Sequence, residues 1–174
     1  MSKYIEHINT QENTLYNNII LLSRNKLFYT KFGLIDAFQN RIHLIFIHIS
    51  FIFIKIKQNN KNKMFKIFYQ KLFDLIFNNI ELNMREIGYG DTTINKSMRF
   101  LTKTFYNILL HCEKYKKMNE EEKKVFFNKH LAQNNIKNNA NIKHIVEYFN
   151  KYEAFCFDLS SDSVLQGELK FNYV

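Results

Sequence analysis

The stretch Phe32–Ile56, FGLIDAFQNRIHLIFIHISFIFIKI, is dominated by isoleucine and phenylalanine. Both residue types are common in β-strands, so a strand is the first alternative to consider. The apolar residues that lead into the run recur at intervals of three or four positions, which is the period of one helix face. These residues are Phe32, Ile35, Phe38, Ile42, Ile45 and Ile49. We therefore predict a helix from about Leu34 to Lys57. Because its second half is apolar nearly all round, we expect it to be enclosed at the centre of the fold.

The apolar run Ile42–Ile56 is also the best candidate for a membrane-spanning helix. It is shorter than the roughly 20 mostly apolar residues that a span needs. It is also interrupted by His43, His48, Ser50 and Lys55. We therefore expect a buried helix. The first 20 residues contain acids and no apolar block, so neither a secretory signal nor a transit peptide is expected.

The composition of the whole chain also favours helices. There is no proline and there are only four glycines, whereas β-hairpins normally use both residues at their turns. Hydrophobic residues make up 46% of the sequence, which is enough for one core. We predict an all-α, single-domain bundle of about six helices, with a central buried helix and an irregular C-terminal tail. Residues 1–27 would form an N-terminal helical segment, and residues 28–174 the main part of the domain.

Periodicity and capping residues place the other helices. Thr10 can cap the first one, and Asn119 followed by Glu122 has the pattern of a capping box. The predicted helices are Thr10–Lys26, Leu34–Lys57, Met64–Glu86, Thr92–Met118, one that Asn119 opens, and one around Ile142–Phe149. The predicted connections are a break at Phe28–Lys31, a loop at Gln58–Lys63, a polar linker at Gln133–Asn141 and the tail from Asp158.

Two of the four glycines lie in the stretch REIGYGD, residues 85–91. Gly88 is placed to end one helix with a positive φ, and Gly90 would let the chain turn again. Asp91, Thr92 or Thr93 can then accept a hydrogen bond from a free amide at the start of the next helix. The alternative is a phosphate site, but no Gly-Lys-Ser/Thr follows at the spacing of a P-loop. We therefore favour a tight corner between two helices.

The formal net charge of +9 suits an anionic partner. An AT-rich genome also supplies lysine, so a simple solvated face is the alternative. Two basic groups are candidates for contact with a membrane surface or ribosomal RNA. They are Lys55, Lys57, Lys61, Lys63, Lys66 and Lys71, and then Lys96, Arg99 and Lys103. Cys112 and Cys156 are far apart and show no metal or redox spacing, which favours a reducing compartment.

Aromatic residues of the predicted helix Met64–Glu86 could line a groove for the helix of another protein. The alternative is that they simply belong to the core. The candidates are Phe65, Phe68, Tyr69, Phe73 and Phe77.

Catalysis and metal binding have weak support. Asp36, Glu81, Glu86 and Asp91 lie near predicted helix ends, where acids are common. His43 and His48, five residues apart, lie on different helix faces and so make poor joint metal ligands. They could ligate haem, although a buried structural histidine is the favoured alternative. We expect no catalytic residue, no metal and no cofactor.

Several short motifs, taken in order, resemble the ubiquinol–cytochrome c chaperone family. The sequence has a Tyr-Thr-x-Phe-Gly start, an Asp-x-Phe with a following Arg, the Arg-Glu-x-Gly-x-Gly-Asp corner, and a short terminal pattern. The matching residues are Tyr29, Thr30, Phe32, Gly33, Asp36, Phe38, Arg41, Arg85, Glu86, Gly88, Gly90, Asp91, Lys96, Phe105, Tyr106, Leu165, Gly167, Leu169 and Phe171. Ile35 stands where the family usually has proline, and Asn40 replaces a common glycine. Both differences would allow an earlier or smoother start of the central helix.

The resemblance implies a non-catalytic all-α chaperone that binds newly made cytochrome b and promotes assembly of the cytochrome bc1 (ubiquinol–cytochrome c reductase) complex. It implies a cytoplasmic protein peripheral to the bacterial inner membrane, or one on the mitochondrial matrix side. Mitochondrial members work beside the ribosome with a small partner and some carry an extra N-terminal segment, which we do not find here. Two alternatives remain. One is a basic helical adaptor that binds a membrane or the ribosome without a respiratory client, and the other is an enzyme acting on a hydrophobic substrate such as a quinone.

Overall fold

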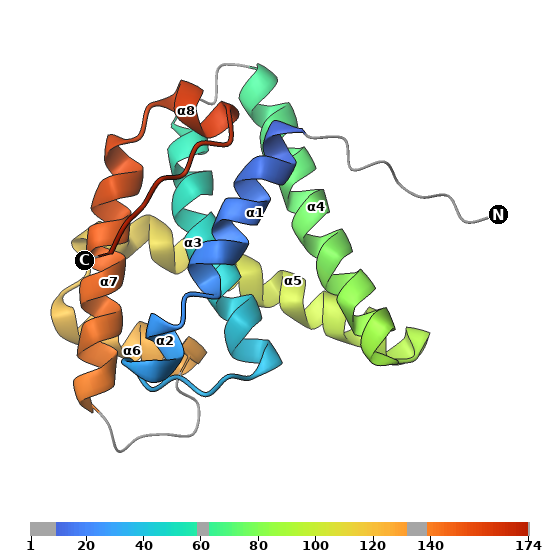
Figure 1. Ribbon diagram of the computed structural model, residues 1–174, viewed down its shortest axis with the longest axis horizontal. Coiled ribbons are helices and arrows are strands. Elements are labelled where there is room, and N and C mark those ends of the chain that lie inside the picture. Colours follow the sequence, from blue (N-terminus) through green and yellow to red (C-terminus); the bar gives the residue numbers. More distant parts are fainter. Residues whose placement is uncertain (1–9, 59–62, 132–138, 174) are drawn as a thin grey trace.

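The computed structural model describes residues 10–58, 63–131 and 139–173, and this part of the chain contains helices and no β-strand. The all-α prediction is therefore confirmed (Figure 1). Six helices of the described chain have twelve or more residues: α1 (Gln11–Ser23), α3 (Phe38–Lys57), α4 (Lys63–Ile87), α5 (Asp91–Lys114), α6 (Glu120–Leu131) and α7 (Asn139–Asp158). The shorter elements are α2 (Leu27–Thr30), the 3-10 helix Tyr115–Lys117 and α8 (Ser161–Leu165).

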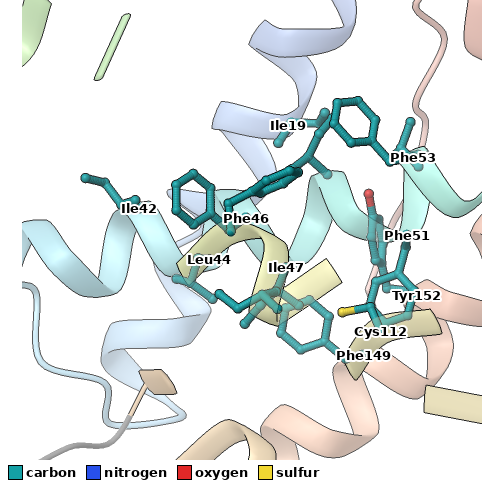
Figure 2. Close-up of a cluster of buried hydrophobic side chains, with 14 of the residues drawn as sticks. Ile19, Ile42, Leu44, Phe46, Ile47, Phe51, Phe53, Cys112, Phe149 and Tyr152 are labelled. Atoms are coloured by element: carbon teal, nitrogen blue, oxygen red, sulfur yellow. The ribbon is translucent and has the colours of Figure 1, made fainter. Parts of the chain in front are cut away.

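The predicted enclosure of the central helix is confirmed. α3 contacts α1, α4, α5, α6, α7 and α8, and Figure 1 shows it running through the middle of the bundle. Between residues 42 and 53 every side chain except that of Ile45 is buried. Figure 2 shows the resulting cluster, in which α3 meets Ile19 of α1, Cys112 of α5 and Phe149 of α7. A helix that is apolar nearly all round is stable in water only when it is covered in this way.

The corner between α4 and α5 confirms the role predicted for Gly88. Its φ is +97°, a backbone conformation that glycine adopts at little cost. The amide of Tyr89 donates to the carbonyl of Met84 (3.1 Å), and the amide of Gly88 donates to the carbonyl of Arg85 (3.0 Å). Those two bonds make a Schellman motif, which satisfies carbonyls at the end of α4.

The chain enters the next helix at Gly90 without needing a glycine there, and the predicted side-chain cap of that helix is wrong. Gly90 has a φ of −73° and itself occupies the N-cap of α5, without a side-chain hydrogen bond. A Cβ added there would meet nothing within 4 Å. Asp91 is already the first helical residue, and its carboxylate accepts a hydrogen bond from Arg85 Nη1 (2.6 Å) instead of capping the helix.

Two predictions near the start of the central helix need correction. The expected break at Phe28–Lys31 contains the one-turn helix α2, which is held by the fully buried Phe28 and begun by a hydrogen bond from the amide of Leu27 to Asn25 Oδ1 (3.0 Å). α3 begins at Phe38 rather than near Leu34, because Ala37 is extended. The preceding loop is held by other contacts: Asn40 Nδ2 donates to the carbonyl of Ile35 (2.8 Å), and Arg41 pairs with Asp36 through two hydrogen bonds of 2.6 and 2.7 Å.

The predicted capping box at the start of α6 is confirmed. The amide of Glu122 donates to Asn119 Oδ1, and the amide of Asn119 donates to Glu122 Oε2, both at 2.9 Å. The preceding helix ends earlier than predicted, since α5 stops at Lys114 and a 3-10 turn follows. The loop predicted at residues 58–63 lies outside the described residues at 59–62, and Lys63 is helical. The linker predicted at residues 133–141 lies outside them at 133–138, and α7 already begins at Asn139.

The tail is more ordered than predicted. α7 continues to Asp158, and the short helix α8 follows, capped by Ser160, whose hydroxyl accepts from the amide of Ser163 (3.0 Å). Beyond α8 the described residues have no regular structure, but they pack on the bundle. Gly167, with a φ of +77°, lies against α1, and its carbonyl accepts a hydrogen bond from Asn18 Nδ2 (2.9 Å). The tail therefore closes over the N-terminal helix.

Candidate functional site

An apolar groove of about 580 Å³ opens where the C-terminal half of α3 and the N-terminal half of α4 meet the C-terminal half of α5. Its volume lies within the roughly 300–1,000 Å³ that is usual for ligand sites. The lining residues are Phe53, Ile54, Ile56, Lys57, Phe65, Lys66, Tyr69, Gln70, Tyr106, Leu109, Leu110 and Glu113. Apolar side chains thus dominate a concave surface that is open to solvent.

The floor and the outer wall of the groove come from different helices. Phe53, Ile56 and Phe65 are buried and form the floor. Leu110 and Tyr106 stand on the outer wall, and Leu110 is 57% exposed. Exposed leucines are common on protein surfaces, but large apolar side chains gathered around a concavity are typical of a binding site.

Tyr69 supplies a polar group inside this apolar wall. Its ring packs on Phe53 with centroids 4.0 Å apart. Burial, together with the nearby Tyr106 and Glu113, raises the pKa of Tyr69 to about 12, so the hydroxyl is neutral at physiological pH and can donate. No hydrogen-bond partner reaches this hydroxyl from the described part of the chain. It is available to a ligand.

One end of the groove is charged. Lys57 Nζ pairs with Glu113 Oε1 at 2.6 Å across α3 and α5. Lys66 on α4 is exposed beside it. Such solvent-exposed pairs contribute little stability, so the pair can open when another molecule contacts the rim.

A second hollow, of about 610 Å³, lies on the N-terminal half of α5. The described residues that line it all belong to α5: Thr92, Asn95, Lys96, Arg99, Phe100 and Lys103. It differs from the groove because three of its six residues are cationic and none is acidic. We refer to it as the basic hollow.

Of the buried histidines, His48 is hydrogen-bonded at both ring nitrogens, whereas His43 Nε2 and His130 Nε2 have no hydrogen-bond partner in the described chain. His48 Nδ1 donates to the carbonyl of Leu44 (2.7 Å), and His48 Nε2 accepts from the Tyr148 hydroxyl (2.9 Å). Burial lowers the pKa of His48 to about 4, so the ring is neutral. His43 Nδ1 lies 2.6 Å from the carbonyl oxygen of His130. Within the described residues no group of three His, Cys, Asp or Glu side chains could hold a metal ion.

Three of the four acids that could have indicated catalysis, Asp36, Glu81 and Asp91, are engaged in ion pairs near helix ends, and Glu86 is exposed. Arg85 binds Glu81 at 2.8 Å and Asp91 at 2.6 Å, which joins α4 to α5 across the glycine corner. Arg41 similarly binds Asp36 and lowers the pKa of that carboxyl, chiefly through the hydrogen bond. Both clusters thus have an evident structural role.

Comparison with known proteins decides the family. The model of the ubiquinol-cytochrome C chaperone family matches residues 30–171. The chain belongs to the ubiquinol–cytochrome c chaperone family. Its fold agrees with a solved structure described as the crystal structure of the Cbp3 homolog from Brucella abortus, with a TM-score of 0.81 at 18% sequence identity. That likeness covers 94% of this chain and 89% of the other, and at such low identity it shows a shared fold. Among curated proteins none matches the chain significantly.

The region that matches the chaperone family contains both the groove and the basic hollow. Apart from Tyr29, it also contains the motif residues from which the resemblance was predicted, and the structure gives several of them a geometric role. Gly33 and Gly88 have positive φ values, and two of the three acids of these motifs, Asp36 and Asp91, pair with arginines. None of the described helices is both long and apolar enough to cross a bilayer.

The five aromatic residues predicted to line a groove have different positions. Phe65 and Tyr69 line the groove. Phe73 is half-buried and stacks on Phe77, with ring centroids 4.5 Å apart. Phe68 and Phe77 are buried in the core, because α4 turns that face inward.

Sequence reasoning missed the part of the groove that α5 supplies. Leu109 was not predicted to line a groove, and neither were Tyr106, which was named only for the family resemblance, and Leu110. Both of the latter lie off the periodic apolar face of α5, and large apolar residues outside such a face are a signal that could have pointed to them. The contribution of Phe53 and Ile56 could not be seen in the sequence, because it depends on how α3 and α4 are packed.

The basic residues predicted to contact a membrane or ribosomal RNA do not share one surface. Lys55 Nζ donates to the carbonyl of Phe157 (2.6 Å), and Lys71 pairs with Glu12 at 3.4 Å. Lys57 binds Glu113 at the groove, while Lys63 and Lys66 are exposed. Lys61 lies outside the described residues. The remaining three, Lys96, Arg99 and Lys103, are all in the basic hollow.

Proposed function

We propose that this chain is a non-catalytic assembly chaperone that binds newly made cytochrome b and promotes assembly of the cytochrome bc1 complex. Membership of the ubiquinol–cytochrome c chaperone family supports the pathway. The observation that supports the binding mode is the open apolar groove between α3, α4 and α5.

The dimensions of the groove suit part of a helix. A volume of about 580 Å³ takes a few apolar side chains, whereas a whole membrane span has about 20 residues. Helix-in-groove recognition uses such anchors at positions i, i+3 or i+4, and i+7. The groove would therefore cover one or two turns of a cytochrome b segment and shield its apolar side chains from water until they find their partners in the complex.

The polar groups of the groove favour a reversible complex. The neutral Tyr69 hydroxyl can donate to a backbone carbonyl at the end of a client helix, where such groups lack partners. Lys57 and Glu113 can exchange their mutual contact for contacts with the client. Because the groove is open, release needs no large movement of the bundle.

The proposed location is the membrane surface where cytochrome b is inserted. That would be the cytoplasmic face of the bacterial inner membrane, or the matrix side in a eukaryote, beside the ribosome. The proposal uses no cofactor and assigns no chemical step.

The test combines deletion of the gene with rescue by point variants. Deletion should remove assembled bc1 complex while its transcripts stay normal. Leu110→Asp, at a position that is 57% exposed, should fold but fail to restore the complex, because it places a charge on the apolar wall. The matched control is Leu21→Asp on α1, at a position that is 70% exposed and outside the groove, and it should restore the complex. Normal bc1 levels in the deletion strain, or full rescue by Leu110→Asp, would refute the proposal.

A second candidate function is supported by the basic hollow alone. A helical adaptor that binds a membrane or the ribosome, without a respiratory client, would need the cations of α5 and not the groove. Crosslinking in cells separates the two functions, since the adaptor would give lipid or ribosomal RNA contacts and no cytochrome b.

A further inference from the structure

Within the described chain, the cations of the basic hollow lack the ion pairs that Lys57, Lys71 and Arg85 make. From Thr92 to Cys112 the sequence has three cationic residues and no acid. Lys96, Arg99 and Lys103 are exposed, and no ion pair or hydrogen bond joins their side chains to the described residues. This face of α5 is therefore an unpaired positive surface.

The arrangement costs the helix some stability. Lys96 and Arg99 are three residues apart, and Arg99 and Lys103 are four apart, which are the spacings at which like charges on a helix repel. Of the acids at the nearby corner, Glu81 and Asp91 are both bound by Arg85, and Glu86 makes no ion pair with any of the three cations in the described chain. An external anion would relieve the repulsion.

Apolar side chains accompany these charges. Phe100 lies among the three cations and is 59% exposed. Ile87 and Tyr89, at the corner that leads into α5, are also exposed. Figure 1 shows this corner at the edge of the molecule, away from α6, α7 and α8. The end of the α4–α5 hairpin is thus both cationic and apolar, and no other described element covers it.

We propose that this end of the α4–α5 hairpin binds the surface of a membrane that contains anionic lipids. Lys96, Arg99 and Lys103 would contact lipid phosphates, and Phe100 would enter the boundary between headgroups and acyl chains. Surfaces that lie in the plane of a membrane combine these two residue classes, Lys or Arg with Phe or Leu. Each cation near an anionic surface strengthens binding by about fivefold. The effects of the three cations multiply, so binding to the surface does not need a deep pocket.

Lipid fits this surface better than other anionic or apolar partners do. Loops of membrane proteins on the cytoplasmic side carry an excess of Lys and Arg, which the three cations would repel. Single-stranded RNA would suit the cations, but it uses aromatic side chains as stacking platforms for successive bases. Among the described residues Phe100 is the one aromatic side chain that lines the hollow, and the other exposed apolar side chains at that end are Tyr89 and the aliphatic Ile87.

The surface also has a geometric relation to the groove. Lys96, Lys103 and Leu110 are seven residues apart and therefore lie on the same side of α5. The rise along a helix places successive members about 10 Å apart. A bilayer that touches the basic hollow would thus lie next to the groove. The inference about lipid does not depend on what occupies the groove.

The experiment measures the partitioning of the full chain onto vesicles. Sedimentation would compare phosphatidylcholine vesicles with vesicles that contain about 30% phosphatidylglycerol, an anionic lipid. The triple variant Lys96→Gln, Arg99→Gln, Lys103→Gln should lose about 100-fold of its partitioning onto the anionic vesicles. Phe100→Ala should lose about tenfold, and binding of the unaltered chain should weaken as salt is added.

The matched control removes the same charge elsewhere. Lys26, Lys31 and Lys143 are exposed, and Figure 1 shows that α2 and α7 lie on the other side of the molecule from the α4–α5 corner. Changing these three to glutamine should leave partitioning within about threefold, because charges beyond a Debye length contribute little. Circular dichroism would establish that each variant is folded.

Three results would overturn the proposal. One is equal partitioning onto anionic and neutral vesicles by the unaltered chain. The second is an equal loss in the α5 triple variant and the control triple variant. The third is retained vesicle binding by the α5 variant with loss of binding to a single-stranded RNA oligonucleotide, which would assign the surface to RNA. The readout is vesicle binding and not bc1 assembly. The outcome is therefore independent of the function proposed for the groove.

Discussion

Alanine substitutions at three glycines should have three different effects on stability, because the glycines differ in φ and in surroundings. Gly90 has an ordinary φ of −73° and open space around it. Gly88 has a φ of +97° and also has open space. Gly167 has a φ of +77° and lies against the backbone of α1. The series therefore separates the cost of the backbone conformation from the cost of close packing.

The magnitudes follow from these differences. Gly90→Ala should change the free energy of unfolding by less than about 0.5 kcal/mol, since a weaker N-cap offsets the reduced freedom of the unfolded chain. Gly88→Ala should lower the free energy of unfolding by about 1 kcal/mol. The strain of the left-handed conformation is partly offset by the reduced freedom of the unfolded chain. At Gly167 a Cβ would lie 2.7 Å from the carbonyl oxygen of Gln11, 2.9 Å from Thr14 Cβ and 3.1 Å from the amide nitrogen of Leu15. Overpacking against a helix backbone raises the total cost there to about 2–4 kcal/mol.

Urea unfolding followed by circular dichroism measures these differences. With a slope of about 2 kcal/mol/M, the unfolding midpoint should fall by about 0.5 M for Gly88→Ala and by about 1–2 M for Gly167→Ala. Gly90→Ala should unfold within about 0.25 M of the unaltered chain. Equal midpoints for the Gly88 and Gly167 variants would refute the packing of the tail on α1. A loss at Gly90 as large as that at Gly88 would refute the assignment of the corner conformation.

Three further predictions concern buried polar groups and a helix cap. Tyr148→Phe should lower the free energy of unfolding by about 1–3 kcal/mol, because it leaves His48 Nε2 buried without its partner. A urea midpoint unchanged from that of the unaltered chain would contradict this contact. Acidification below about pH 6.5, the ordinary histidine pKa, should progressively destabilise the fold. Burial holds the pKa of His48 and of His130 at about 4 in the folded chain. The same histidines take up protons at a higher pH in the unfolded chain, so acid favours unfolding. Stability measured across this range should fall towards pH 4, and a flat profile would show that these rings are accessible to protons. Asn119→Ala should lower the free energy of unfolding by about 1 kcal/mol through the loss of the capping box at α6. Adding Glu122→Ala to that variant should then lower it little further. Fully additive losses from the two substitutions would argue against reciprocal hydrogen bonds.

Local patterns in the sequence were sufficient for the main helices and several of their ends. The three- and four-residue spacing that leads into residues 42–56 decided for helix over strand, although the residue types alone favour strands. Gly88 and the Asn119–Glu122 pair were identified from their sequence context, because the backbone groups left free at a helix end are satisfied by residues that are close in the sequence. Gly90 shows the limit of that reasoning. Its φ is one that any residue can adopt, and a side chain at this position would have open space within the described chain.

Features that depend on contacts between distant segments could not be predicted in the same way. α2 exists because a buried phenylalanine, Phe28, packs against Tyr148 of α7, with ring centroids 4.8 Å apart. Among the aromatic residues of α4, only packing decides that Phe65 faces the groove while Phe68 faces the core. Lys96, Arg99 and Lys103 were identified as a basic group, but the exposure of Phe100 among them was visible only in the fold.

The most direct test of the proposed function is photo-crosslinking from the groove in living cells. A photoreactive phenylalanine analogue placed at Leu110, which is exposed on the outer wall, should crosslink to newly made cytochrome b. The same analogue at Leu21, on α1 and outside the groove, should not. The account predicts a cytochrome b adduct at the first position alone. Equal adducts at both positions, or none at Leu110 in cells that are making cytochrome b, would contradict it.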